Sequence, residues 1–481
     1  MKEKVLKKGI VMFLVMAIIG TSLLGCNGAA GSSESTKETG SSSEASSSPE
    51  ASGETTAAAI DSIDAAAGEG KVLNIYCWNE QFQERFEKLY ADKVPEGVEV
   101  KWLITPTQNN AYQEKLDQDL PVNEAASEPI DIFLLEADYI LKYVNSDVSV
   151  DIKELGITDD DLKEQYKYTQ EIATDQDGKL KATSWEADPG VFVYRRSIAK
   201  DVLGTDDPDE VQAYISDWNK FSEVAAQMQG KGYQMLSGFD DAYRTFSNNV
   251  SQPWVNENDE IVIDPAVEQW VDQTKEFTDS GYNNKTSLWS PEWNSDQGPT
   301  GKVFGFFYST WGVNFTLLGN ALETPEAEGG KKEIGNGVYG DYAICYGPAN
   351  YYWGGTWIAA ARGTDNPTLV ADVMRTITCD AESMKELTYG FEDFVNNQAA
   401  MQEVADSDYT SDFLGGQNHI ALFLEVAPKI DMSNVSEYDQ GLTESFQAAM
   451  MDYFNGQVTK EEAVDNFYTA AIEKYPNLKR P

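Results

Sequence analysis

The chain has 481 residues, which is enough for two domains and an additional tail. Lysine and arginine number 36 against 80 aspartates and glutamates, giving a formal net charge of −44 at pH 7. A surface this acidic repels phosphate backbones and anionic lipid, which argues against nucleic-acid binding and electrostatic membrane docking. The single histidine, His419, excludes a multi-histidine metal site and leaves one possible base for a catalytic triad. The four cysteines include no CxxC pair, so zinc ribbons and thioredoxin-type redox chemistry are unsupported.

The first 25 residues predict a secretory signal. Four lysines precede an apolar run over residues 10–24, which is shorter than the ~20 residues that a membrane-spanning helix needs. The run ends in Leu-Leu-Gly-Cys, with the cysteine at Cys26. This ending resembles the bacterial lipobox, which implies a lipoprotein signal peptide over 1–25 and acylation of Cys26. An ordinary signal peptide or an uncleaved anchor is the alternative.

Residues 26–70 predict a disordered tether. Serine, glycine, alanine, glutamate and threonine dominate this segment, and it contains no aromatic residue. Such a composition cannot bury enough apolar surface to offset the entropy lost on ordering. A flexible chain of this length typically reaches roughly 35–40 Å, which suits a protein held at an outer membrane face.

From residue 71 onward, apolar runs typical of strands alternate with segments of helical spacing. Residues 72–78 fit a buried strand, and Phe82, Phe86 and Leu89 then recur at helical spacing. This alternation predicts a parallel α/β sheet, whose ligands lie beyond the carboxyl ends of the strands. The other predicted strands are 98–104, 130–135, 178–185, 190–194, 303–308 and 342–346, and the other helices lie near 111–119, 218–229 and 266–279 and over much of the chain after 367.

Two local patterns have simple structural interpretations. Residues 186–189 are interpreted as the turn between the strands 178–185 and 190–194. Residues 175–178 superficially suggest a calcium loop, but its first and twelfth positions are Ala173 and Ser184, so we expect a hairpin turn. Beyond Cys26, three cysteines remain in apolar surroundings, and we expect buried free thiols, with one disulfide pair as the alternative: Cys77, Cys345 and Cys379.

Several short stretches stand out in order along nearly all of 71–481: 72–80, 130–138, 178–194, 301–311, 354–361 with Asn366-Pro367 after it, and the helix start at 454–463. In these stretches and in their order, the body of the chain resembles the extracellular solute-binding proteins of ABC importers, in particular the sugar-binding family that includes maltose-binding protein. Residues 194–196 read Tyr-Arg-Arg where that family often has Tyr-Asn-Lys, a departure at a position that we expect to be structural.

This resemblance implies a two-lobed α/β fold of the periplasmic-binding-protein-like type II class, with a ligand cleft between the lobes. It implies one lobe over 71–185 plus 354–405 and the other over 186–353 plus 406–481. A monomer without cofactor, metal or enzymatic activity is expected, with a carbohydrate and the permease subunits of an ABC transporter as partners.

A sugar presents apolar C–H faces and a ring of hydroxyls, so its site needs aromatic platforms and hydrogen-bonding carboxylates. Both residue types occur at the predicted strand ends, and the resemblance favours Trp311 as a stacking platform. For each tryptophan the alternative is core packing. The loop residues Trp254, Trp289 and Trp293 are expected to line or cap the cleft. The predicted ligand-binding residues are Trp78, Asn79, Glu80, Glu136, Asp138, Trp185, Glu186, Asp188, Tyr243, Trp311, Trp353 and Tyr438.

The leading hypothesis from the sequence is a lipid-anchored receptor on the extracellular face of a bacterial membrane. It would capture a carbohydrate, in particular an oligosaccharide, and deliver it to an ABC transporter permease. One alternative is a secreted glycoside hydrolase, which would need two carboxylates across the scissile bond. Another keeps the binding fold and changes the ligand to a peptide, a polyamine or a metal chelate.

Overall fold

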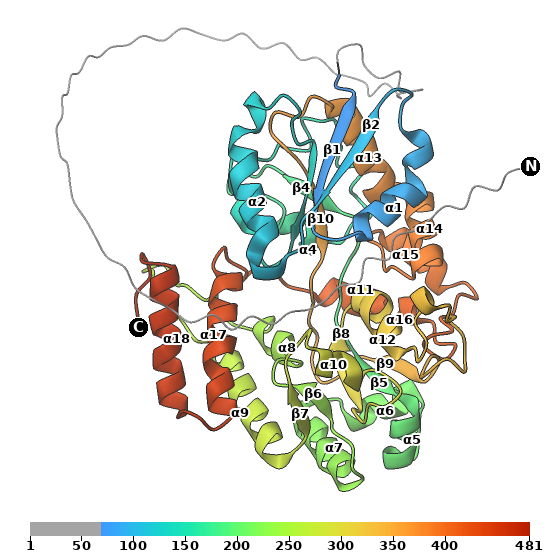
Figure 1. Cartoon of the computed structure of the whole chain (residues 1–481), viewed down its shortest axis with the longest axis vertical. Coiled ribbons are helices and arrows are strands. Elements are labelled where there is room, and N and C mark those ends of the chain that lie inside the picture. Colours follow the sequence, from blue (N-terminus) through green and yellow to red (C-terminus); the bar gives the residue numbers. More distant parts are fainter. Residues whose placement is uncertain (1–68) are drawn as a thin grey trace, which may run out of the picture. The chain divides into compact units, whose positions relative to one another are not determined.

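The computed structural model describes residues 69–481, which all belong to one compact unit, Asp61–Pro481. The predicted signal segment, the acylation site Cys26 and the tether lie outside the described residues. Figure 1 shows the body as two main sheets, each with helices packed around it. Within residues 69–481, no helix combines the length and the apolar character that crossing a bilayer requires.

The first sheet has five strands in the order β2-β1-β3-β10-β4. The strands β1, β2 and β3 are parallel, as the sequence predicts, but β10 runs antiparallel to β3 and β4. Thr356 at the start of β10 pairs with Glu136 at the end of β3, because the chain re-enters this sheet at the carboxyl ends of its parallel strands. The prediction of a parallel sheet is therefore corrected to a mixed one. The strands are β1 (Val72–Cys77), β2 (Glu99–Ile104), β3 (Ile132–Glu136), β4 (Ala182–Ser184) and β10 (Thr356–Ala360).

Helices with one apolar face cover the first sheet. In α1, the predicted positions Phe82, Phe86 and Leu89 are all buried, which confirms the helical spacing in that segment. The later helices α13 and α14 pack against α1 although they follow it by almost 300 residues. These helices are α1 (Gln81–Leu89), α2 (Ala111–Asp119), α3 (Ile140–Val144), α4 (Lys167–Glu171), α13 (Pro367–Thr378), α14 (Ala381–Phe391) and α15 (Gln398–Ala405).

The second sheet is antiparallel, with the strand order β8-β5-β9. This sheet contains β5, whereas β4 belongs to the first sheet. The two strands that the sequence predicted on either side of residues 186–189 therefore lie in different sheets. The segment 186–189 is a connection between the two sheets and not a turn within one. The strands are β5 (Val191–Arg195), β8 (Gly305–Tyr308) and β9 (Tyr342–Cys345), with a separate parallel pair β6 (Leu236–Gly238) and β7 (Asn283–Thr286).

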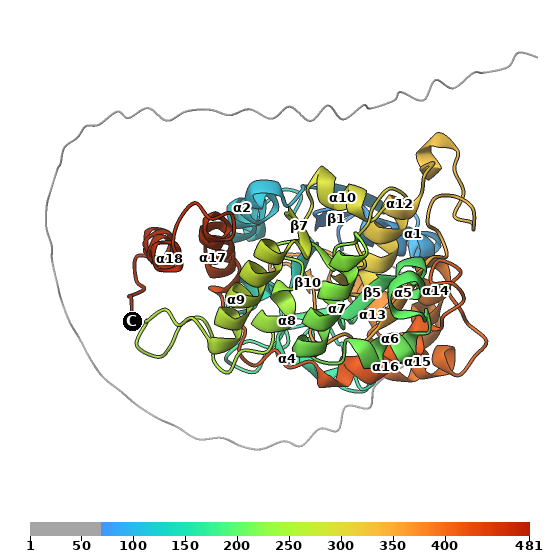
Figure 2. The same ribbon diagram turned by 90° about the horizontal axis from the view of Figure 1, so that it is seen from below.

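The second sheet is surrounded by the remaining helices. The helices α17 and α18 lie side by side, and α17 also packs against α9 (Figure 2). A capping box between Thr459 and Glu462 starts α18 at the position that the sequence predicted. The longer helices are α5 (Arg196–Leu203), α6 (Pro208–Tyr214), α7 (Trp218–Gly230), α8 (Tyr243–Ser247), α9 (Pro265–Ser280), α10 (Pro291–Asp296), α16 (His419–Val426), α17 (Asp439–Phe454) and α18 (Lys460–Lys474).

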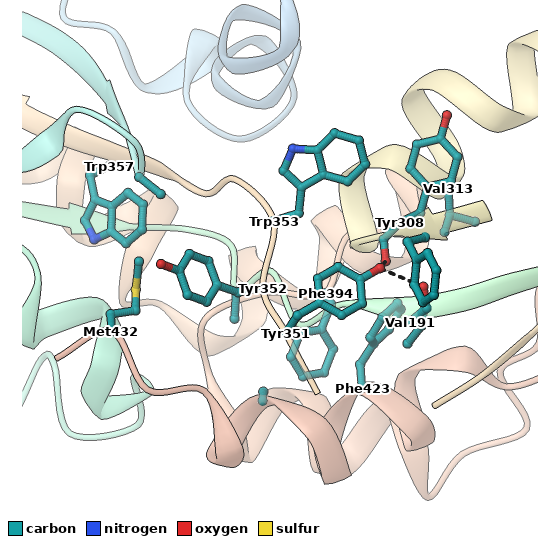
Figure 3. Close-up of a cluster of buried hydrophobic side chains, with 14 of the residues drawn as sticks. Val191, Tyr308, Val313, Tyr351, Tyr352, Trp353, Trp357, Phe394, Phe423 and Met432 are labelled. Carbon is teal, nitrogen blue, oxygen red and sulfur yellow. Dashed lines mark hydrogen bonds between the residues drawn. The ribbon is translucent and has the colours of Figure 1, made fainter. Parts of the chain in front are cut away.

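The connections between the two sheets run side by side. Pro189 in the first connection pairs with Tyr352 in the second, and Glu186 pairs with Val395. The hydroxyl oxygen of Tyr351 lies 2.8 Å from the carbonyl oxygens of Val191 and Tyr308, which ties the second connection to the core (Figure 3). A cluster of buried aromatic residues therefore fixes the chain where it passes between the sheets.

The second connection ends in two glycines that the backbone requires. Gly354 and Gly355 have φ angles of +77° and +115°, which side chains disfavour. A Cβ atom at Gly355 would lie 2.8 Å from the Trp357 ring and 3.2 Å from Asp188 Oδ2. The three described cysteines are free thiols, as predicted: Cys77 and Cys345 are buried and Cys379 is partly buried.

Candidate functional site

A cavity of about 510 Å³ lies beside the second connection between the sheets. Its lining comes from the segment after β6 with α8, the loop 248–264 that leads into α9, the start of α9, the loop before α10, residues 351–353, residues 431–435 and the first half of α17. Asp138, which follows β3, is the one lining residue contributed by the first sheet's end. Small-molecule sites typically have volumes of roughly 300–1,000 Å³, so the cavity has the size of a ligand site.

Aromatic rings form the walls of this cavity. Trp353 is nearly buried and stacks on Tyr308, with 5.8 Å between ring centroids and 14° between ring planes. Figure 3 shows Trp353 on the same segment as Tyr351 and Tyr352, which also line the cavity. Trp289 is 54% exposed, and the centroid of its ring lies 6.0 Å from that of Trp353. The walls therefore present both enclosed and open aromatic faces.

Trp311 lies behind this wall and is not among the lining residues. Its indole nitrogen donates to the carbonyl oxygen of Trp353 at 2.9 Å. Its ring faces Trp289 at a centroid distance of 6.1 Å, with 19° between the planes. Three tryptophans line the cavity, Trp254, Trp289 and Trp353, and the predicted platform Trp311 contacts the last two of them.

One ion pair crosses the edge of the cavity. Arg244 on α8 donates two hydrogen bonds to Asp138, at 2.9 and 2.6 Å. Burial opposes ionisation of Asp138, but the facing guanidinium outweighs it and holds the pKa of Asp138 below its ordinary value. The Arg244 guanidinium also lies 5.6 Å from the centroid of the Trp353 ring. The pair joins the end of β3 to α8 and places both charges beside an aromatic face.

Three predicted carboxyls lie outside the cavity lining: Glu136 is partly buried like Asp138, whereas Glu186 and Asp188 are buried. Glu136 accepts a hydrogen bond from the Asp138 backbone N–H at 2.8 Å, and burial together with the Asp138 charge raises the pKa of Glu136 to about 8. Burial and the nearby Asp393 raise the pKa of Glu186 to about 8. Burial and Glu186 also raise the pKa of Asp188 well above its ordinary value, although Thr310 donates to it at 3.0 Å. Burial therefore favours the protonated form of Glu136 and Glu186, in which a carboxyl offers a hydrogen-bond donor as well as an acceptor.

Several residues that line the cavity were not predicted from the sequence. Burial raises the pKa of Asp240 and Asp439 to about 7, and that of Asp241 to about 6. Asp240 and Asp241 closely follow β6, so the strand-end rule that selected Asp138 would have found them had that short strand been recognised. Arg244 and Asp439 carry no comparable signal, because each reaches the cavity from a helix.

The remaining predicted site residues lie outside the cavity lining. Asn79 accepts a hydrogen bond from Gln81 N–H at the start of α1, and the neighbouring Glu80 is exposed. The other three residues contact neighbouring aromatic rings or form a hydrogen bond near the C-terminus. Trp78 packs edge-on against Tyr112, the fully buried Trp185 stacks on Phe82, and Tyr438 accepts a hydrogen bond from Asn477. The structure therefore brings Asp138, Tyr243 and Trp353 together at the cavity, with Glu136, Glu186, Asp188 and Trp311 behind it.

The described residues offer little for metal or histidine chemistry. Among residues 69–481, no cluster of three or more histidine, cysteine, aspartate and glutamate side chains is arranged to hold a metal ion. His419 is fully buried at the start of α16, outside the cavity lining, and burial lowers its pKa to about 4.

The chain matches the model of one protein family, described as bacterial extracellular solute-binding protein, over residues 80–412. This match covers more than half of the chain, so the chain belongs to that family. The choice between a receptor and a hydrolase is thereby decided: the protein is a solute-binding protein and not an enzyme. The sequence has no significant match among curated proteins.

Solved structures share the fold at low sequence identity. An extracellular solute-binding protein of family 1 aligns with a TM-score of 0.66 and 17% identity, covering 84% of this chain and 99% of its own. A binding protein from B. animalis subsp. lactis in complex with β-1,6-galactobiose gives 0.63 and 17%, covering 85% and 98%. The galacto-N-biose/lacto-N-biose I-binding protein of Bifidobacterium longum gives 0.63 and 13%, covering 86% and 100%. These alignments confirm the two-lobed α/β fold class.

Proposed function

We propose that this solute-binding protein captures a carbohydrate, in particular an oligosaccharide, and delivers it to the permease of an ABC transporter. The observation that carries the proposal is the composition of the 510 Å³ cavity. Its aromatic walls match the apolar faces of sugar rings, and its carboxyls and one guanidinium match hydroxyl groups. The two similar structures described as complexes with β-1,6-galactobiose and with lacto-N-biose support the same ligand class.

A titration of the full-length protein with saccharides tests this proposal. The panel contains mono- to tetrasaccharides of the galacto, malto and cello series, with spermidine and a tripeptide as representatives of the other solute classes. We expect calorimetry to detect binding of at least one saccharide series, and chromatography to recover the bound sugar uncleaved. Binding of spermidine or the peptide without any saccharide would contradict the carbohydrate proposal.

The two lobes are proposed as 71–185 plus 354–405 and 186–353 plus 406–481. The strands support this division, since every strand of the five-stranded sheet falls within the first lobe and the others fall within the second. Lobes joined by such connections close around a ligand as a hinge movement. Small-angle scattering of protein lacking residues 27–70 should show a smaller radius of gyration once a panel sugar saturates the site, and an unchanged radius would argue against closure.

Anchoring is proposed through acylation of Cys26 at the extracellular face of the membrane. The support is the sequence pattern at 10–26, which lies outside the described residues. Cys26→Ala should release the protein into the medium without changing its affinity for saccharides. Continued membrane association of the variant would instead indicate that residues 10–24 act as an uncleaved anchor.

A further inference from the structure

We propose that Trp289 is a specificity-determining residue of this site. Its indole forms the platform for a sugar ring at the open end of the cavity, so that the receptor selects saccharides longer than one ring. The inference rests on the proposed carbohydrate function and names a residue and a ligand length for it.

The first observation is the exposure of Trp289. The chain has 11 tryptophans, all within residues 69–481, and Trp289 is the one whose side chain is mostly exposed, at 54%. It nevertheless lines the cavity, together with the nearly buried Trp353. An indole that is half in the cavity and half in solvent marks the place where a bound ligand would extend beyond the enclosed volume.

The second observation is the way in which neighbouring indoles orient this ring. Trp289 packs edge-on against Trp293 at 5.3 Å and lies nearly parallel to Trp311 at 6.1 Å. Trp353 is 6.0 Å away, with 57° between the ring planes. These contacts fix the orientation of the ring, and 54% of the residue is still exposed to solvent. A fixed, open aromatic face is the geometry that stacks on the C–H face of a sugar ring.

The third observation is the backbone of Trp289, which has a φ angle of +68°. The N–H of Ser290 donates to the carbonyl of Ser287 at 3.1 Å, so Trp289 is the third residue of a hydrogen-bonded four-residue turn. A positive φ at this position is typical of a type II turn, which favours glycine. The turn is held further by the N–H of Leu288, which donates to the Asp240 carboxylate at 3.2 and 3.3 Å. The fold alone would therefore favour glycine here, and the indole is held in a disfavoured conformation without being buried.

Binding measurements with matched variants test the inference. The variants are Trp289→Ala and, as a control, Tyr389→Ala, which removes an exposed aromatic ring that does not line the cavity. For the saccharide series that the wild type binds, Trp289→Ala should weaken the tri- and tetrasaccharide about 10- to 100-fold. The monosaccharide affinity should stay within about twofold, and Tyr389→Ala should leave every affinity unchanged.

Acrylamide quenching provides a second readout that depends on Trp289 itself. Because the other indoles are mostly buried, Trp289→Phe should remove most of the quenchable fluorescence, and a saturating tetrasaccharide should protect the same component in the wild type. Equal losses for mono- and tetrasaccharide, or no loss for either, would overturn the inference while leaving the carbohydrate proposal intact. If the wild type binds no saccharide of the panel, the proposed function fails, and the inference fails with it.

Discussion

Replacing Asp138 by asparagine should lower the free energy of unfolding by about 2 kcal/mol at pH 7. The change removes one partner of a bidentate ion pair with Arg244, whose contacts are 2.9 and 2.6 Å. The side chains of Arg244 and Asp138 are 24% and 32% exposed. Exposed pairs contribute about 0–1 kcal/mol, and breaking a fully buried pair costs about 3–5 kcal/mol, so a partly buried pair should lie between them.

The pH dependence of this effect has a definite sign. The folded-state pKa of Asp138 lies below its unfolded-state value, because the Arg244 guanidinium outweighs the effect of burial. The pair therefore stabilises the fold fully above the unfolded pKa of about 3.9, and this contribution is lost as the pH falls through the folded pKa. The difference between wild type and Asp138→Asn should accordingly shrink in strong acid.

Urea unfolding monitored by tryptophan fluorescence measures these free energies. A double-mutant cycle of Asp138→Asn and Arg244→Gln should give a coupling energy of about 1 kcal/mol or more. The control is Glu128→Gln, which removes the exposed pair Lys101–Glu128 and should cost less than about 0.5 kcal/mol. A coupling below about 0.5 kcal/mol would refute the reasoning, since it would mean that solvent surrounds the pair and that β3 and α8 are apart in solution.

Three further predictions concern single side chains. Burial lowers the pKa of His419 from 6.5 to about 4, so between pH 7 and 4.5 the unfolded chain takes up a proton at this residue and the folded chain does not. The wild type therefore loses stability over this range, and His419→Phe should reduce that loss by about 2 kcal/mol. Urea unfolding at both pH values measures the difference. Gly355→Ala should lower the free energy of unfolding by about 2–3 kcal/mol, since its Cβ would lie 2.8 Å from the Trp357 ring. The control Gly416→Ala, at a residue with a positive φ but open space around it, should lower it by about 1 kcal/mol. Equal melting temperatures of the two variants would contradict the close approach at Gly355. At position 289, Trp289→Gly should be about 1 kcal/mol more stable than Trp289→Ala, because glycine alone tolerates the φ of +68° without strain, and denaturation that ranks alanine higher would exclude that strain.

The sequence by itself predicted those features that depend on residues close together along the chain. The strands β1, β3 and β5 were found because continuous apolar runs stand out from polar flanks, and α1 because its apolar residues recur at helical spacing. Asp138 was selected because it follows a buried strand, where α/β proteins bind ligands. The family resemblance, carried by the order of short motifs, predicted the two-lobed fold that the alignments confirm.

Only the tertiary structure decided which of these elements meet. The antiparallel entry of β10 and the separation of β4 from β5 follow from connections between the sheets, which leave no periodic pattern in the residues involved. Asp138 and Arg244 are 106 residues apart, and Trp311 is withdrawn from the cavity by a hydrogen bond to Trp353, 42 residues away. Local propensity extends over a few residues, whereas a cavity wall is assembled from distant segments whose packing minimises exposed apolar surface. For that reason the sequence predicted aromatic and acidic residue types, and the packing of the chain selected the individual side chains that line the cavity.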